Sequence, residues 1–220
     1  MKRNAIAIAT ATLALGFAAT AHAQVSGDTI KIGFISDMSG VYSDVDGLGG
    51  AEAIKMAIAD AGVVIAGKKV EFISADHQNK ADIAASKARE WFDQQGVDML
   101  IGGTNSGASL AMAKVAAEKK KIFIAIGAGS SRLTNEECTP YTVHYAYDTV
   151  ALARGTGGTI VKQGGKNWYF MTADYAFGHS LEKDTAEVVK AAGGKVLGSV
   201  KHPLGASDFS SFLLQAQAAK

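Results

Sequence analysis

Short apolar runs alternate with helical patterns along the chain from residue 29 onward. The first run, residues 30–35, alternates and then becomes continuously apolar, as a buried strand does. The helix predicted over 49–61 carries one apolar face, formed by Ile54, Ala57, Ile58 and Ala61. Further strands are predicted at residues 70–75, 98–101, 122–126, 142–145, 167–172 and 195–201. Strands that alternate with helices of about 10–15 residues indicate an α/β architecture with parallel sheets.

The pattern restarts near residues 146–149, which predicts a second lobe. Asp148 is the expected N-cap of a helix that runs to about residue 162. The last helix, capped by Ser207 or Asp208, is expected to turn four apolar residues inward: Phe209, Phe212, Leu213 and Ala216. The second half offers only two clear strands, and a two-stranded parallel sheet is marginal alone. We therefore expect either a fragment of a longer protein or a chain completed by a partner.

The N-terminus has the pattern of a cleaved secretory signal peptide over residues 1–23. Lys2 and Arg3 precede an apolar run, and residues 21–23 read Ala-His-Ala, a small-x-small cleavage site. The run is too short to span a bilayer comfortably, which favours cleavage before Gln24 over a retained anchor. The predicted mature protein is periplasmic.

Composition and charge exclude several classes of protein. The 48% hydrophobic and 20% charged residues are typical of a folded globular chain rather than a disordered one. Without Lys2 and Arg3 the mature chain has 20 basic and 21 acidic side chains, a net charge of −1 that gives no case for nucleic acid. The single cysteine, Cys138, rules out an internal disulfide framework and is expected to be either free and buried or paired outside this chain.

Motifs for nucleotide, ester and metal chemistry fail on spacing. The turn over residues 102–109 has P-loop glycines, but Ala108 stands where the phosphate-binding lysine belongs. Ser109 approximates a hydrolase nucleophile, yet it follows its strand by eight residues and falls inside the next predicted helix. The histidines show no metal-ligand spacing. We expect no enzyme activity, no metal and no cofactor, with a secreted α/β hydrolase using Ser109 or Ser130 as the rival.

Polar loops at the carboxyl ends of the strands form the candidate site, because open α/β sheets bind ligands there. The loop residues that we single out are Tyr42, Ser43, Asn105, Ser106, Ala128, Gly129, Ser130, Ser131, Asp174 and Tyr175. Asn105 and Ser106 open a helix, where N–H groups and a hydroxyl suit a carboxylate. Nothing among these residues forms a nucleophile–base pair, so the set favours holding a small molecule over converting it.

The order of these segments resembles the type I periplasmic solute-binding proteins of ABC importers, in the branched-chain amino-acid-binding (leucine-binding protein) family. The resemblance covers residues 25–220 and rests on these segments: Ile32-Gly33-Phe34, Met38-Ser39-Gly40, Gly49-Gly50-Ala51-Glu52, Ile101-Gly102-Gly103 before Asn105-Ser106, Gly127-Ala128-Gly129-Ser130, Asp174-Tyr175-Ala176-Phe177-Gly178 and Ser207-Asp208-Phe209-Ser210. It implies two Rossmann-like lobes with parallel sheets that close on a ligand. The lobes would be residues 24–146 and a partial C-terminal lobe, 147–220.

The resemblance also implies roles for the loop residues. Ser106 with its neighbouring N–H groups and the Ser130 hydroxyl would meet the ligand carboxylate, and the Ala128 carbonyl would face an ammonium. Tyr175 would close over the ligand from the second lobe, while Tyr42 would line the first.

The implied protein is a monomer that delivers its solute to ABC permease subunits. An extracytoplasmic sensor of the same fold stays open as an alternative. The family's acidic partner for an amino group lies beyond the residues present, and family members run well past this length. The residues leave a branched-chain amino acid and an aromatic or other organic acid equally open as the ligand.

Overall fold

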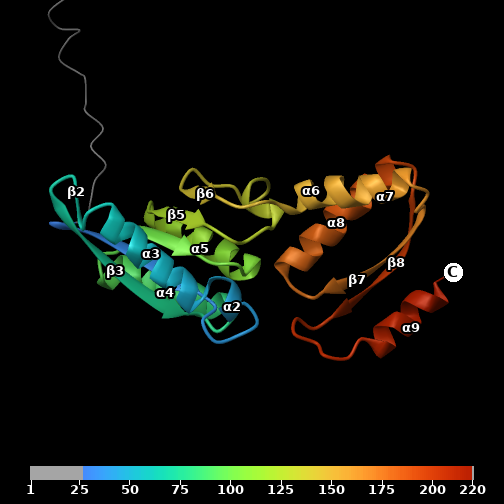
Figure 1. Cartoon of the computed structure of the whole chain (residues 1–220), viewed down its shortest axis with the longest axis horizontal. Helices are drawn as coiled ribbons and strands as arrows, with labels where there is room; N and C mark the ends of the chain where they lie inside the picture. Colours follow the sequence, from blue (N-terminus) through green and yellow to red (C-terminus); the bar gives the residue numbers. More distant parts are fainter. Residues whose placement is uncertain (1–26, 220) are drawn as a thin grey trace, which may run out of the picture.

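The computed structural model describes residues 27–219, which form two α/β lobes placed end to end (Figure 1). The first lobe comprises the elements from β1 to β6, and the second lobe those from α6 to α9. The predicted signal peptide, residues 1–23, lies outside the described residues. The lobe boundary expected between residues 146 and 147 stays a prediction.

The first lobe is built on a six-stranded sheet in the order β2-β3-β1-β4-β5-β6. Its strands are β1 (Thr29–Ser36), β2 (Val64–Ile65), β3 (Lys68–Asp76), β4 (Met99–Gly102), β5 (Ile122–Ala125) and β6 (Thr142–His144). All neighbours pair in parallel except β2 and β3, which form an antiparallel hairpin that the hydrophobic pattern did not predict. Ala66 and Gly67 both adopt positive φ between these two strands, as a two-residue hairpin loop requires.

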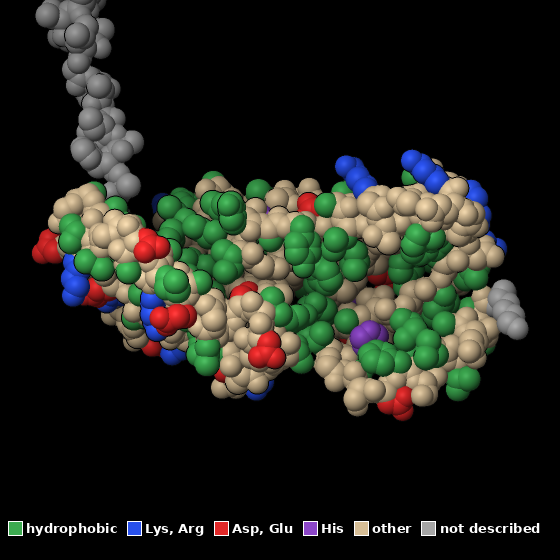
Figure 2. Space-filling view, viewed as in Figure 1, with side chains coloured by type: hydrophobic (Ala, Val, Ile, Leu, Met, Phe, Trp, Pro, Cys, Tyr) green, Lys and Arg blue, Asp and Glu red, His purple; other side chains and the backbone are tan. Residues whose placement is uncertain are grey.

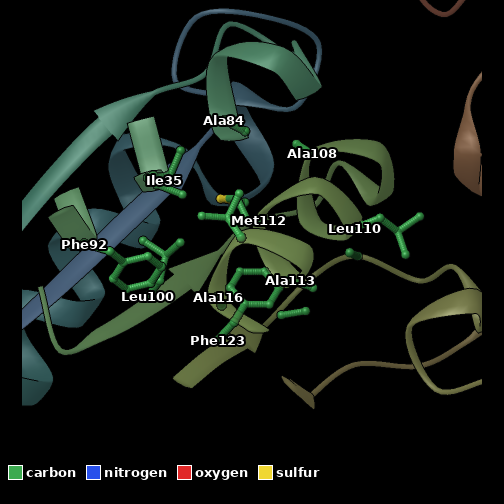
Figure 3. Packing of buried hydrophobic residues seen from close by; sticks show 14 of the residues in the cluster. Ile35, Ala84, Phe92, Leu100, Ala108, Leu110, Met112, Ala113, Ala116 and Phe123 are labelled. Carbon is green, nitrogen blue, oxygen red and sulfur yellow. The ribbon is translucent and has the colours of Figure 1, made fainter. Parts of the chain in front are cut away.

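Helices α4 and α5 bury most of the first lobe's core against the sheet. The helices of this lobe are α2 (Ser43–Asp46), α3 (Leu48–Asp60), α4 (Ala81–Gln94) and α5 (Ser106–Lys119), followed by a 3₁₀ turn, η1 (Ser131–Leu133). Figure 3 shows Leu100 and Phe123 of the sheet among Met112, Ala113 and Ala116 of α5. The predicted face of α3 is only partly correct, because Ala57 and Ala61 are exposed.

The second lobe has one parallel strand pair, β7 (Asn167–Ala173) and β8 (Lys195–His202). Its helical segments are α6 (Thr149–Leu152), the π-helical η2 (Ala153–Gly157), α7 (Gly158–Lys162), α8 (Ala176–Ala191) and α9 (Ser210–Ala218). Helix α8 contacts both strands, and it also packs against α6, η2 and α7. The inward position predicted for Leu213 is wrong, because its side chain in α9 is 50% exposed.

Candidate ligand-binding site

Helix α5 begins at the carboxyl end of β4, and its first residues belong to the candidate site. Asn105 is the N-cap, and its Oδ1 accepts a hydrogen bond from the Ala108 N–H at 2.9 Å. Its Nδ2 donates to Oδ1 of Asn79, which follows β3. Ser106 is fully buried directly after this cap. The cap therefore holds the Ser106 hydroxyl at the N-terminus of a long helix, where partial positive charge accumulates.

The loop after β5 brings Ala128, Gly129 and Ser130 to the same place. The Ser130 N–H donates to Ser106 Oγ at 3.2 Å, so the two predicted carboxylate-binding serines are direct neighbours. The Ala128 carbonyl oxygen lies 2.6 Å from Nε2 of His144 in β6. The carbonyl that the sequence assigned to a ligand ammonium already has a partner from its own lobe.

Tyr42 and Tyr175 meet across the two lobes, with their hydroxyl oxygens 2.5 Å apart. Asp37, 1% exposed, positions Tyr42 by accepting the N–H groups of Gly40 at 2.8 Å and Tyr42 at 3.0 Å. Tyr175 directly precedes α8, and its ring lies 6.1 Å from that of Phe177. Burial raises the pKa of both tyrosines above the ordinary value of 10, which keeps both hydroxyls protonated.

The glycines at the end of β4 and directly after it, Gly102 and Gly103, allow close packing. A Cβ on Gly102 would lie 2.6 Å from the Phe123 ring, and one on Gly103 would collide with the Ser36 side chain. Beside them the Asp46 carboxylate accepts hydrogen bonds from the hydroxyls of Ser36, at 2.8 Å, and Thr104, at 2.7 Å. The Gly-rich turn that resembled a phosphate loop is thus occupied by the protein's own side chains.

A cavity lies within the second lobe. It has a volume of about 570 Å³ and is lined by β7, α8 and the end of β8, with Trp168 and Phe170 among its apolar walls. Figure 2 shows hydrophobic side chains gathered around the hollowed face of this lobe. Tyr175 reaches this cavity, but Asn105, Ser106 and Ser130 do not line it. The structure brings the two serines together and the two tyrosines together, and of these four residues only Tyr175 lines the cavity in the second lobe.

Sequence reasoning missed three residues that contact the site loop. Ser180 of α8 places its Oγ 2.7 Å from Ser130 Oγ. Thr149 donates its N–H to the Gly129 carbonyl at 2.8 Å, and the Phe177 ring would be 2.9 Å from a Cβ on Gly129. Of the three, only Phe177 could be noticed in the sequence, because it belongs to the Asp174–Gly178 segment on which the family resemblance rests. Thr149 and Ser180 look like ordinary helix residues until the two lobes are placed together.

The hydroxyls proposed as rival nucleophiles are both engaged. Ser109 lies within α5, is fully buried, and donates to the Gly103 carbonyl at 3.1 Å. Ser130 is fully buried against Ser106 and Ser180. For neither serine does a histidine appear among the hydrogen-bond partners within residues 27–219.

Other features of the described residues bear on the remaining expectations. Cys138 is exposed and has no disulfide partner among the described residues, so the alternative of a free and buried thiol is wrong, and a partner outside this chain stays a prediction. Over residues 27–219 no group of three or more His, Cys, Asp or Glu side chains is placed to hold a metal ion. In the same range no helix has the length and apolarity that a membrane crossing needs.

Comparison with known proteins identifies the family. A family model described as "Periplasmic binding protein" matches residues 29–220. The chain belongs to this family. Its fold is the type I periplasmic-binding-protein fold, as the arrangement of the segments predicted, and the family is one of solute-binding proteins.

Individual relatives agree with this assignment. A periplasmic binding protein from Burkholderia mallei is 71% identical, with a TM-score of 0.85 over 87% of this chain and 51% of its own. A solute-binding protein of an ABC transporter from Rhodopseudomonas palustris BisB5, solved with 3,4-dihydroxybenzoic acid, is 31% identical, with a TM-score of 0.74 over 88% of this chain and 52% of its own. A Leu/Ile/Val-binding protein homologue from Brucella abortus is 24% identical over 92% of this chain. The chain spans about half the length of the curated relatives it matches.

Proposed function

We propose that the chain forms part of a periplasmic binding protein that captures a small carboxylate between its two lobes and delivers it to the permease of an ABC importer. The observation that carries this proposal is the pairing of Ser106 and Ser130 at the N-terminus of α5. A helix N-terminus with hydroxyl groups suits a carboxylate. The proposed ligand-binding residues are Tyr42, Asn105, Ser106, Ala128, Gly129, Ser130 and Tyr175.

Binding requires the lobes to separate first. The Ser130 hydroxyl is fully buried against Ser180 of the second lobe, and the Tyr42 hydroxyl is bonded to that of Tyr175. A solute carboxylate would replace these protein–protein hydrogen bonds as the lobes reclose over it. The bound form gains contacts from both lobes that an open form lacks, which is the physical basis of capture.

We propose an aromatic carboxylate as the first candidate ligand. Tyr42, Tyr175 and Phe177 stand at the junction of the lobes, with Tyr147 beside Gly129, and aromatic rings pack favourably on one another. The relative from R. palustris was solved with an aromatic acid of this kind. A branched-chain amino acid is the second candidate, supported by the name of the Brucella relative.

Isothermal titration with 3,4-dihydroxybenzoate and with leucine tests the ligand class, using this chain beside the B. mallei relative. We expect 3,4-dihydroxybenzoate to bind, and Ser130→Ala in this chain to weaken binding about tenfold, because a hydrogen bond to a charged group contributes about 1.5 kcal/mol. Ser211→Ala, at an exposed position of α9, is the matched control. Binding of leucine alone would move the proposal to amino acids. Binding of neither acid by either protein would contradict it.

Export and delivery need separate experiments. The mature protein is expected to begin at Gln24 and to sediment as a monomer, which intact mass and ultracentrifugation measure. In cells that lack the gene, uptake of labelled 3,4-dihydroxybenzoate should fall. Unchanged uptake with a lost transcriptional response to the acid would favour the sensor alternative, and ester hydrolysis that Ser109→Ala abolishes would favour the hydrolase.

A further inference from the structure

Thr149 connects the candidate site loop, residues 129–131, to helix α8. Its N–H donates to the Gly129 carbonyl at 2.8 Å, and its Oγ1 accepts the Ser131 N–H at 3.0 Å. The same Oγ1 lies 2.5 Å from Oδ2 of Asp184 in α8. Thr149 is fully buried, and Asp184 is 7% exposed. Thr149 therefore contacts both ends of the loop, through its backbone N–H at Gly129 and its hydroxyl at Ser131, and the hydroxyl links the loop to Asp184 of α8.

The direction of these hydrogen bonds follows from the donors available. A threonine hydroxyl has one hydrogen and accepts with its lone pairs. Because Oγ1 accepts the Ser131 N–H, its hydrogen is free to donate to the Asp184 carboxylate. A buried carboxylate is costly unless it is hydrogen bonded, so removal of the Thr149 hydroxyl leaves both the carboxylate and the Ser131 N–H without this partner.

Asp184 belongs to one face of α8 that covers the site loop. Phe177, Ser180 and Asp184 recur at three- and four-residue spacing, which places them on the same side of the helix. Phe177 lies against Gly129, and Ser180 Oγ is 2.7 Å from Ser130 Oγ. The helix therefore meets each residue of the loop from 129 to 131, with Ser131 contacted through Thr149.

We propose that Asp184 is a positioning residue that acts through Thr149 to hold the site loop and fix the orientation of the two lobes. It does so without touching a ligand. The coupling consists of contacts among the protein's own residues, so it stands independently of the ligand class proposed above. Loss of the coupling removes the link that Thr149 makes between α8 and the loop, and it broadens the distribution of lobe orientations.

A double-mutant cycle with Thr149→Val and Asp184→Ala tests the coupling in this chain. We expect each single variant to lower the equilibrium constant for folding. The constant of the double variant should be about tenfold higher than the combined effects of the two single substitutions predict. Thr149→Ser keeps the hydroxyl, so it should retain most of the folding stability that Thr149→Val loses. Thr185→Val is the matched control, since Thr185 is also buried in α8 but its side chain forms no hydrogen bond within the described residues. Additive effects, or no rescue by Thr149→Ser, would overturn the proposal.

Spin labels on both lobes measure the orientation directly. Cys138 is free and exposed in the first lobe, and Lys190→Cys supplies an exposed site in α8. Pulsed dipolar spectroscopy should give a narrow distance distribution for the labelled parent and for Thr185→Val. Asp184→Ala and Thr149→Val should each give a broader or shifted one, and Thr149→Ser the parental one. Identical distributions in all variants would contradict the proposal even if ligand binding were later confirmed.

Discussion

The hydroxyl oxygens of Tyr42 and Tyr175 lie 2.5 Å apart, although 133 positions separate them in the chain. Tyr42 comes from the loop that Asp37 holds after β1, and Tyr175 from the turn before α8. Each ring is partly buried, and burial keeps the pKa of both hydroxyls above the ordinary value. One phenol therefore donates to the other at neutral pH, and this hydrogen bond connects the loop after β1 in the first lobe to the second lobe.

Removal of either hydroxyl should loosen this contact. We expect Tyr42→Phe and Tyr175→Phe each to lower the free energy of unfolding by about 1 kcal/mol, the usual contribution of a hydrogen bond. The double variant should lose little more than either single one, because the same interaction is removed. Urea unfolding measures all three. Tyr145→Phe, at a side chain 76% exposed, is the control and should be neutral. Fully additive losses would mean that the two hydroxyls do not interact in solution.

Gly129 is expected to resist substitution because two rings press on it. A Cβ there would lie 2.9 Å from the Phe177 ring and 3.0 Å from that of Tyr147. Gly129→Ala should lower the free energy of unfolding by about 1–3 kcal/mol, the typical cost of overpacking. Gly155→Ala is the matched control, since a Cβ on Gly155 meets no atom within 4 Å. Thermal unfolding compares them, and equal melting temperatures would contradict the close packing of α8 on the site loop.

His77 predicts a pH dependence of stability. The side chain is fully buried, and its Nε2 has no hydrogen-bond partner within the described residues. Burial lowers its pKa below the ordinary 6.5, against the opposing pull of Asp37, Asp76 and Asp46. At a pH between this lowered pKa and 6.5, the unfolded chain binds more protons at His77 than the folded chain does. The contribution of His77 to the free energy of unfolding is therefore fully present above about pH 6.5 and is lost as the pH falls.

The variant His77→Gln tests this dependence. It should flatten the fall in unfolding free energy below pH 6.5, because glutamine does not titrate. Urea unfolding from pH 5 to 8 measures the slope in the parent and in His77→Gln. An unchanged slope in His77→Gln would assign the pH dependence to other groups.

The first lobe's core should respond to truncation in the ordinary way. Leu100 of β4 is fully buried, and its replacement by alanine leaves a cavity beside α5. We expect Leu100→Ala to cost about 2–5 kcal/mol. Leu214→Ala, at a side chain 65% exposed in α9, should change stability by less than about 0.5 kcal/mol. Similar losses for both would mean that α9 is covered in solution.

The local pattern of the chain was enough to predict most of its elements and the α/β class, although it missed the hairpin strand β2. The buried runs at β1, β4 and β5 depend only on which residues are apolar, so their pattern is visible without coordinates. The Asp148 cap is equally local, and its Oδ1 accepts the Ala151 N–H at 2.7 Å. The proximity of Ser106 to Ser130 followed from the rule that the carboxyl ends of parallel strands share one edge.

Only the tertiary structure decided how the two lobes meet. The contacts of Tyr42 with Tyr175 and of Ser130 with Ser180 join residues 133 and 50 positions apart. No periodicity encodes such pairs, because they arise from the packing of one lobe on another. The exposure of Leu213 and Cys138 has the same origin. A residue is buried only if another part of the protein packs on it. A hydrophobic pattern shows which face of a helix is apolar, but it does not show what packs against that face.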